Sequence, residues 1–318
     1  MVELNENTTF AITADTEELE QQAKLLVQSI ETYAPMSEIV VFIPECSRGS
    51  LSKSSLNQFR SAAKVVWGEI PIPEYPISAL LAAFVAAEQA TETEYVVALD
   101  TDTILLDSIS VQGDYDVWVR PVDVGAQYWG SQDAIYDWQT LYEYFGLTMP
   151  SQDEYIVASV DRRKIPPYWN SGVVVTTDRS LPQRWLEYTE AMYDNDVLPV
   201  SRGEFFLDQL SLALVTRQNR VCKLDEVANY PLGGRLRLPP DVSLVHYGDR
   251  RNLSRVFSQP ARDQLDAIGA IPDFSIDSTI RSFLDLASTK SGHVFNYKRK
   301  KQLRTFLEKR LPKQIIDT

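Results

Sequence analysis

The order of hydrophobic and polar positions predicts alternating strands and helices over the first third of the chain. The apolar run TTFAITA (8–14) precedes a segment with apolar residues at helical spacing, which Pro35 ends. The same alternation predicts further strands at 38–44, 63–70 and 94–100, and a buried helix at 77–90. Strands that are apolar on both faces and alternate with helices are typical of a mostly parallel sheet between helical layers.

The pattern is less regular beyond residue 107. It predicts strands at 116–121, 172–177, 221–226 and 242–249, and helices at 131–147, 181–193 and 204–217. Strand signals are absent after residue 255. We therefore expect a Rossmann-like α/β domain at 1–254, with a single mostly parallel or mixed twisted sheet and helices on both faces. A helical C-terminal extension should follow at 255–318.

Composition narrows the classes of protein. The 318 residues are 44% hydrophobic, which suffices for a sizeable core. The net charge of −13 argues against a nucleic-acid binder, since such proteins usually carry a basic face. No apolar stretch is long enough to cross a bilayer, and the first residues, MVELNENTTF, lack the pattern of a signal peptide. These features predict a cytoplasmic protein.

Two aspartates, Asp100 and Asp102, follow the apolar strand EYVVAL. Ligands of open α/β sheets gather beyond the carboxyl ends of the strands, where this pair is expected. Two carboxylates that bracket one residue can bind one divalent cation, and their hard oxygen atoms suit Mg²⁺ or Mn²⁺. A solvated turn at the strand end is the alternative, and the D-x-D pattern by itself does not decide between them.

Three further motifs follow the D-x-D pattern in the sequence. They are NSG at 170–172, GEFFLDQLSLAL at 203–214 and VSLVHYGD at 242–249. This order resembles that of the nucleotide-sugar transferases of the type A fold, and most closely glycosyltransferase family 8, to which glycogenin belongs. The resemblance covers about residues 8–250. It implies transfer of a sugar from a nucleotide diphosphate, with a UDP-sugar as the favoured donor and a carbohydrate or lipid-linked acceptor.

The resemblance also implies roles for individual residues. Asp100, Asp102 and His246 would bind a catalytic Mn²⁺ or Mg²⁺, and an imidazole among the ligands favours Mn²⁺. Asn170, Asp208 and Gln209 would be catalytic, with Gln209 beside the anomeric carbon. The nucleotide and the rest of the donor would contact a larger set of residues: Thr13, Ala14, Asp15, Asp100, Thr101, Ser171, Gly172, Arg250 and Arg251. Asp15 also stands where a helix N-cap is expected.

The sequence departs from the family pattern in two places. Family 8 usually continues H-x-x-G-x-x-K-P-W, whereas HYGDRRNL has Gly248 one position early and arginines in place of lysine. The helix before the D-x-D pattern often carries a basic residue in the family, and the segment IPEYPISALLAAF at 72–84 has none. Arg250 or Arg251 can supply a cation for the diphosphate.

Several alternatives remain open from the sequence. The strand with D-x-D also resembles the first motif of haloacid-dehalogenase phosphatases, in which Asp100 would be the nucleophile and Asp102 the acid/base. A non-catalytic binding protein on the same fold is the other alternative. Retention of the anomeric configuration follows from the family 8 resemblance, and an inverting enzyme would instead use Asp208 or Glu204 as a base.

Two segments suggest partners. Tyr128 and Trp129 precede an aromatic-rich helix and can stack acceptor sugars, whereas packing is the expected role of the rings within the helix. The basic segment 297–313 places Leu303, Phe306 and other apolar residues on one helical face. This helix can dock on its own domain or bind peripherally to the inner face of an anionic membrane.

Overall fold

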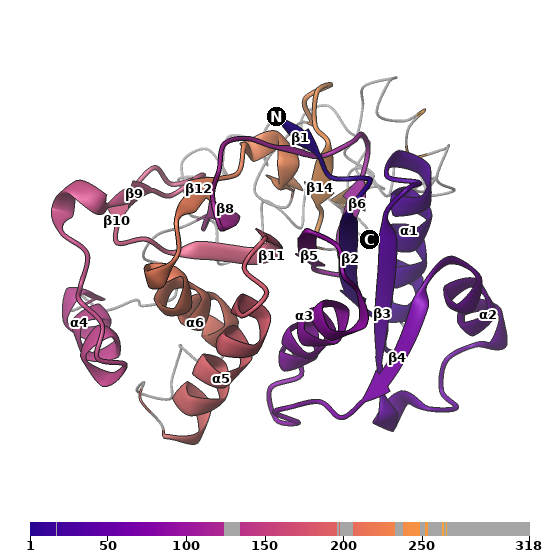
Figure 1. Ribbon diagram of the computed structural model, residues 1–318, viewed down its shortest axis with the longest axis horizontal. Coiled ribbons are helices and arrows are strands. Elements are labelled where there is room, and N and C mark those ends of the chain that lie inside the picture. Colours follow the sequence, from indigo (N-terminus) through magenta and orange to yellow (C-terminus); the bar gives the residue numbers. More distant parts are fainter. Residues whose placement is uncertain are drawn as a thin grey trace, which may run out of the picture.

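Seven strands form a mixed central sheet of order β12-β8-β11-β5-β2-β3-β4 (Figure 1). The computed structural model describes residues 1–16, 18–123, 134–195, 197, 206–232, 238–248, 252–253, 263 and 265. The strands are β2 (Thr8–Thr13), β3 (Glu38–Pro44), β4 (Lys64–Gly68), β5 (Tyr95–Leu99), β8 (Val117–Pro121), β11 (Trp169–Thr176) and β12 (Val221–Lys223). β11 runs antiparallel to both of its neighbours, and the other pairs are parallel.

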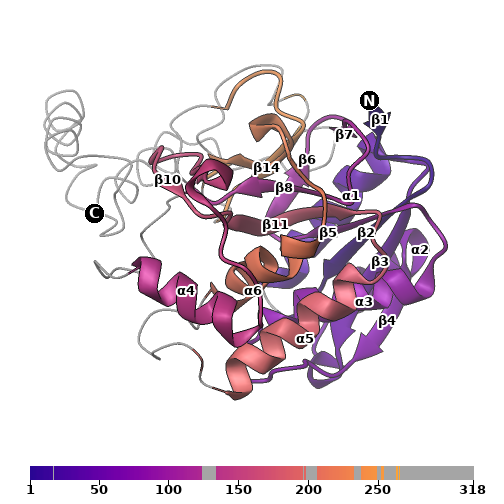
Figure 2. The same cartoon turned by 60° about the vertical axis from the view of Figure 1, so that its left-hand side comes forward.

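Helices cover both faces of this sheet (Figures 1 and 2). They are α1 (Glu18–Tyr33), α2 (Lys53–Ala62), α3 (Ser78–Ala90), α4 (Ala134–Tyr144), α5 (Leu181–Asp194) and α6 (Leu207–Val215). Successive strand residues point to opposite faces. Phe10 and Ile12 therefore pack in one cluster with α1 and α2, whereas Ala11 packs in another with α3, α5 and α6. This layered α/β arrangement confirms the predicted fold class.

A second, three-stranded sheet of order β13-β14-β6 lies beside the carboxyl end of β5. Its strands are β6 (Thr103–Leu105), β13 (Tyr230–Pro231) and β14 (Leu244–His246), and β6 packs against α1. Two antiparallel pairs complete the strands, β1 (Val2–Glu3) with β7 (Ser110–Val111) and β9 (Ile156–Val157) with β10 (Lys164–Ile165). The small sheet therefore places β14 beside β6, the strand that directly follows Asp100 and Asp102.

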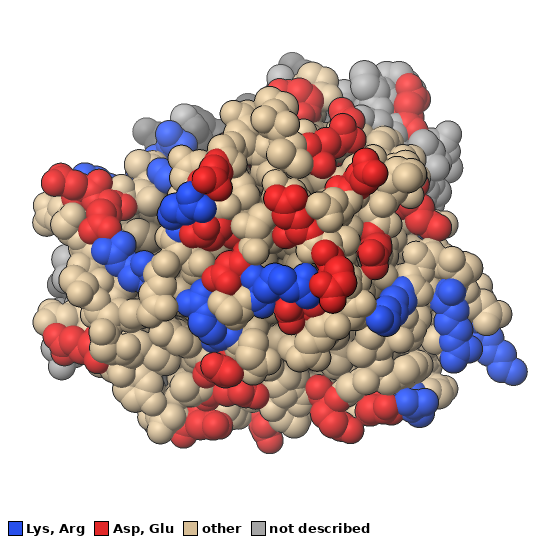
Figure 3. All heavy atoms as spheres, in the orientation of Figure 1, with Lys and Arg blue, Asp and Glu red and all other residues tan. Residues whose placement is uncertain are grey.

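The described surface agrees with the acidic composition. On the face shown in Figure 3, acidic and basic side chains of the described residues are interspersed, and no continuous basic patch covers that face. Among the described residues, no helix combines the length and the apolar composition that a membrane span requires. The predicted C-terminal extension lies outside the described residues, apart from residues 263 and 265.

Candidate active site

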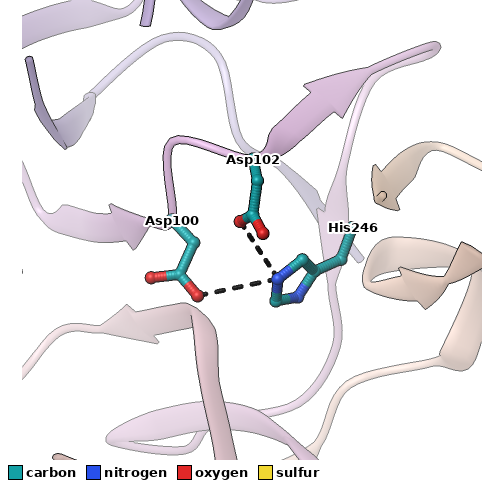
Figure 4. Close-up of side chains that lie close together, drawn as sticks. All are labelled: Asp100, Asp102 and His246. Atoms are coloured by element: carbon teal, nitrogen blue, oxygen red, sulfur yellow. Dashed lines mark ion pairs between the residues drawn. The ribbon is translucent and has the colours of Figure 1, made fainter. Parts of the chain in front are cut away.

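The two aspartates lie in a tight turn between β5 and β6. The backbone N–H of Asp100 donates to the carbonyl of Gly172 at 2.9 Å, which ties the turn to β11. The backbone N–H and the hydroxyl of Thr103 both donate to the carbonyl of Asp100, at 3.1 and 2.7 Å. Because these bonds fix the turn on both sides, the carboxylates of Asp100 and Asp102 are held beside each other (Figure 4).

His246 reaches the same turn through strand pairing. β14 lies antiparallel to β6, and the register places His246 opposite Thr103. The backbone N–H of Tyr247 also donates to the carbonyl of Asp102 at 3.0 Å. The imidazole Nε2 therefore lies 3.1 Å from Asp102 Oδ1 and 3.7 Å from Asp100 Oδ2 (Figure 4). The structure thus brings together three side chains that are far apart in the sequence.

These three side chains fit a divalent cation. One ligand atom from each lies within 4.8 Å of the other two, and the side chains are 18–28% exposed, which leaves an approach for a ligand. Burial, followed by the charge of Asp102, raises the pKa of Asp100. Burial lowers the pKa of His246. The negative charges of Asp102 and Asp100 have a larger, opposite effect, so this pKa lies above its usual value. Crowded carboxylates of this kind are stabilised by a nearby positive charge.

Gly172 allows the close approach of β11 to this group. A Cβ atom at Gly172 would lie 2.6 Å from two atoms of the His246 ring and 3.0 Å from Asp100 Oδ2. The pairing of β11 with β8 is irregular between Trp169 and Val174, so the NSG segment departs from the regular ladder. A larger residue at position 172 would displace His246 from the aspartates.

Asn170 is oriented by two hydrogen bonds to its side-chain oxygen. The Gly172 N–H donates to Asn170 Oδ1 at 3.2 Å, and Asn229 Nδ2 donates to the same oxygen at 2.9 Å. The carbonyl end of the amide is therefore already used within the protein. Its NH₂ group is the part that remains for a ligand, and it can donate hydrogen bonds to oxygen acceptors.

Asp208 is buried in the first turn of α6, with 3% of its surface exposed. Burial raises the pKa of Asp208, while hydrogen bonds from Ser171 and Tyr75 oppose this effect. Its charge in turn contributes to the raised pKa of Asp100, and its neighbour Ser171 precedes Gly172, which lies against Asp100. Asp208 is therefore part of the same region as the D-x-D turn, and Gln209 follows it at the surface of the helix with intermediate burial.

The end of β2 lies at the same edge of the sheet. β2 pairs in parallel with β5 through Ala11 and Ala98, so Thr13 ends its strand level with Asp100. The hydroxyl oxygen of Thr13 is buried without a hydrogen-bond partner among the described residues, and Ala14 is fully buried. Asp15 Oδ1 accepts from the Thr16 N–H at 2.7 Å and from the Ser47 hydroxyl. Thr101 lies at the apex of the D-x-D turn with intermediate burial.

Other predicted residues fall outside the described part of the chain. They are Arg250, Arg251, Glu204, Tyr128, Trp129 and the tail 297–313. Within the aromatic-rich helix, Trp138 and Tyr142 are buried in the core, as expected for packing residues. Sequence reasoning missed Asn229 and Tyr75. The only local signal for Tyr75 is its position between two prolines in the loop before α3.

Comparisons with known proteins place this geometry in context. Residues 10–220 match a family model described as the Rhodobacterales glycosyltransferase domain, whereas no curated protein sequence matches the chain. The apo form of the glycosyltransferase GlyE of Streptococcus pneumoniae TIGR4 aligns over 89% of this chain at 12% identity, with a TM-score of 0.45. The chain covers 64% of that GlyE chain, which is less than two thirds of its length. An active-site mutant of LgtC aligns over 83% of this chain and 95% of its own at 14% identity, with a TM-score of 0.47.

The family match covers more than half of the chain and includes three of the four motifs. Asp100, Asp102, the NSG segment and Asp208 lie within the matched residues, and His246 lies beyond them. His246 therefore joins the group on the evidence of the structure. The match supports a glycosyltransferase over the phosphatase and the non-catalytic binding protein. The chain belongs to the Rhodobacterales glycosyltransferase family.

Proposed function

We propose that the enzyme transfers a sugar from a nucleotide diphosphate to a carbohydrate or lipid-linked acceptor, with Mn²⁺ as the cation and retention of configuration. This is the chemistry of type A transferases similar to family 8, with a UDP-sugar as the favoured donor. The observation that carries the proposal is the convergence of Asp100, Asp102 and His246 beside the NSG segment and the buried Asp208. Each of these features lies at the carboxyl edge of the sheet, where ligands of such folds bind.

In this proposal, Asp100, Asp102 and His246 hold the cation. A divalent ion at this position supplies positive charge that stabilises a departing diphosphate. The end of β2, with Thr13 and Asp15, accommodates the base and ribose, because it ends at the same edge as the aspartates. The free donors of the Asn170 amide bind the sugar, since its oxygen is engaged by Gly172 and Asn229.

The hydrogen bonds and the burial of the Asp208 carboxylate favour retention of the anomeric configuration. An inverting transferase needs a carboxylate base with a free oxygen that can reach the acceptor hydroxyl. The Asp208 carboxylate instead accepts hydrogen bonds from Tyr75 and Ser171, and it is almost completely buried. These contacts suit a fixed negative charge that orients bound sugar. We assign Gln209, the next residue, to the anomeric side of the donor.

The proposed function can be tested with a panel of nucleotide sugars. We expect at least one UDP-sugar to raise the melting temperature of the full-length protein in the presence of Mn²⁺, and to do so less in the presence of EDTA, since a ligand of the native state stabilises it by mass action. The same donor should be hydrolysed slowly with Mn²⁺. If neither stabilisation nor hydrolysis depended on the metal for any donor, the proposed function would be wrong.

The role of Asn170 gives a second test. In Asn229→Ala, Asn170 loses the 2.9 Å hydrogen bond that helps to fix its amide. We expect the KM for the donor to rise about 3- to 10-fold, as is typical for losing one buried hydrogen bond, while affinity for Mn²⁺ stays unchanged. Asn219→Ala is the control, because Asn219 bonds Asp178 and Arg184 away from the site. An equal KM in both variants would contradict this role of Asn229.

A further inference from the structure

Tyr75 is a buried residue of the loop between β4 and α3, and it contacts Asp208. Its hydroxyl donates to Asp208 Oδ1 at 2.6 Å, and the backbone N–H of Asp208 donates back to the same hydroxyl oxygen at 3.2 Å. Only 5% of the Tyr75 surface is exposed. One phenol group therefore fixes both the side chain and the backbone of Asp208 at the beginning of α6.

The surroundings of Asp208 hold it in place from further directions. Trp185 Nε1 donates to the Asp208 carbonyl at 2.8 Å, and the Ser171 hydroxyl bonds to its carboxylate. Ser171 is followed by Gly172, which lies against Asp100 and His246. A continuous path of contacts thus links Tyr75 to the D-x-D turn through Asp208 and the NSG segment.

The loop that carries Tyr75 is held by its own hydrogen bonds. The N–H of Tyr75 donates to the carbonyl of Ile72 at 2.9 Å, and the N–H of Ser78 donates to the carbonyl of Tyr75 at 2.9 Å. The Ser78 hydroxyl, in addition, accepts from the Ile72 N–H at 3.1 Å and donates to the Ile72 carbonyl at 3.2 Å. These bonds fix the backbone from which the phenol reaches Asp208.

We propose that Tyr75 is a positioning residue, which holds the Asp208 carboxylate in the orientation that sugar transfer requires. This inference rests on the proposed function, since it assigns Asp208 to the donor sugar. A buried carboxylate needs hydrogen-bond donors to remain in place. Tyrosine supplies one donor without adding a positive charge beside the cation site. Burial, with the charge of Asp208, raises the pKa of Tyr75, so the phenol keeps its proton and remains a donor.

Tyr75→Phe removes the hydroxyl and keeps the ring. We expect kcat to fall about 10- to 100-fold, as misplacement of a group in an active site can cost, while KM for the donor changes less. Affinity for Mn²⁺ should stay within about twofold of the wild type, since Tyr75 bonds to none of the three metal-binding side chains. Tyr142→Phe is the matched control, because the Tyr142 hydroxyl is also buried but has no hydrogen-bond partner in the part of the chain that the structure describes. Its kcat should equal that of the wild type.

A double-mutant cycle then separates positioning from a general structural effect. If Tyr75 acts through Asp208, Tyr75→Phe should lower the residual kcat of Asp208→Ala by less than about twofold, because the two residues act as one unit. A wild-type kcat in Tyr75→Phe, or an equally large loss in both backgrounds, would overturn the inference. A wild-type enzyme without Mn²⁺-dependent turnover would instead overturn the proposed function, so the two failures are distinguishable.

Discussion

Asp102→Asn should abolish both Mn²⁺ binding and sugar transfer while the fold remains intact. The substitution keeps the size of the side chain but removes its charge, and an amide is a much weaker ligand for a hard cation than a carboxylate. Asp102 also lies 3.1 Å from the His246 ring and provides the largest favourable charge for it. Without the bound cation, the transition state would lose several kcal/mol of electrostatic stabilisation. This corresponds to a loss of about a thousandfold or more in kcat/KM.

The measurement is a pair of titrations, one with Mn²⁺ followed by calorimetry and one with the donor followed by turnover. Asp107→Asn is the matched control, since Asp107 is an exposed carboxylate just beyond β6. That control should bind Mn²⁺ as the wild type does. If Asp102→Asn retained metal binding within about tenfold, His246 and Asp100 would have to hold the ion without it, and the three-residue site would be wrong.

The main strands could be predicted because each is a continuous apolar run. EIVVFIP at 38–44 became β3 with those bounds, and YVVAL became β5 with all five residues buried. The second helix was missed because it contributes few apolar residues to the core, and its buried residues are only Ser55 and Phe59. The strand β6 was missed because it has three residues and is stabilised by pairing with β14, far along the chain.

The candidate site was predictable to the extent that its residues sit in local motifs. Asp100 and Asp102 stand out as charges that end a buried strand, and proximity in sequence places them together. His246 needed the family resemblance, since a single histidine after a short strand does not reveal its partner. Tyr75 lies 133 residues from Asp208, and no periodicity in the sequence relates the two. Contacts of that kind depend on how α3 and α6 pack on the sheet, which local pattern does not specify.

Gly172→Ala tests whether the approach of β11 sets the geometry of the metal site. The added Cβ would meet Cε1 and Nδ1 of His246 at 2.6 Å, well inside van der Waals contact, and Asp100 Oδ2 at 3.0 Å. Because Val173 pairs with Leu99 of β5 and the Gly172 carbonyl accepts from the Asp100 N–H, the imidazole should move rather than the strand. We expect Mn²⁺ affinity to fall about 10- to 100-fold, the usual effect of disturbing the support of a metal ligand, with a comparable or larger loss of kcat/KM.

The control for this prediction is a glycine-to-alanine change that strains the backbone elsewhere. Gly146 has a φ of +63° and no atom within 4 Å of an added Cβ, so Gly146→Ala should lower the melting temperature through backbone strain alone. Its affinity for Mn²⁺ should equal that of the wild type. Calorimetric titration of the three proteins, with circular dichroism to verify folding, makes the comparison. Wild-type Mn²⁺ affinity in folded Gly172→Ala would show that His246 can leave its observed position without weakening the site, and it would therefore remove His246 from the set of metal ligands.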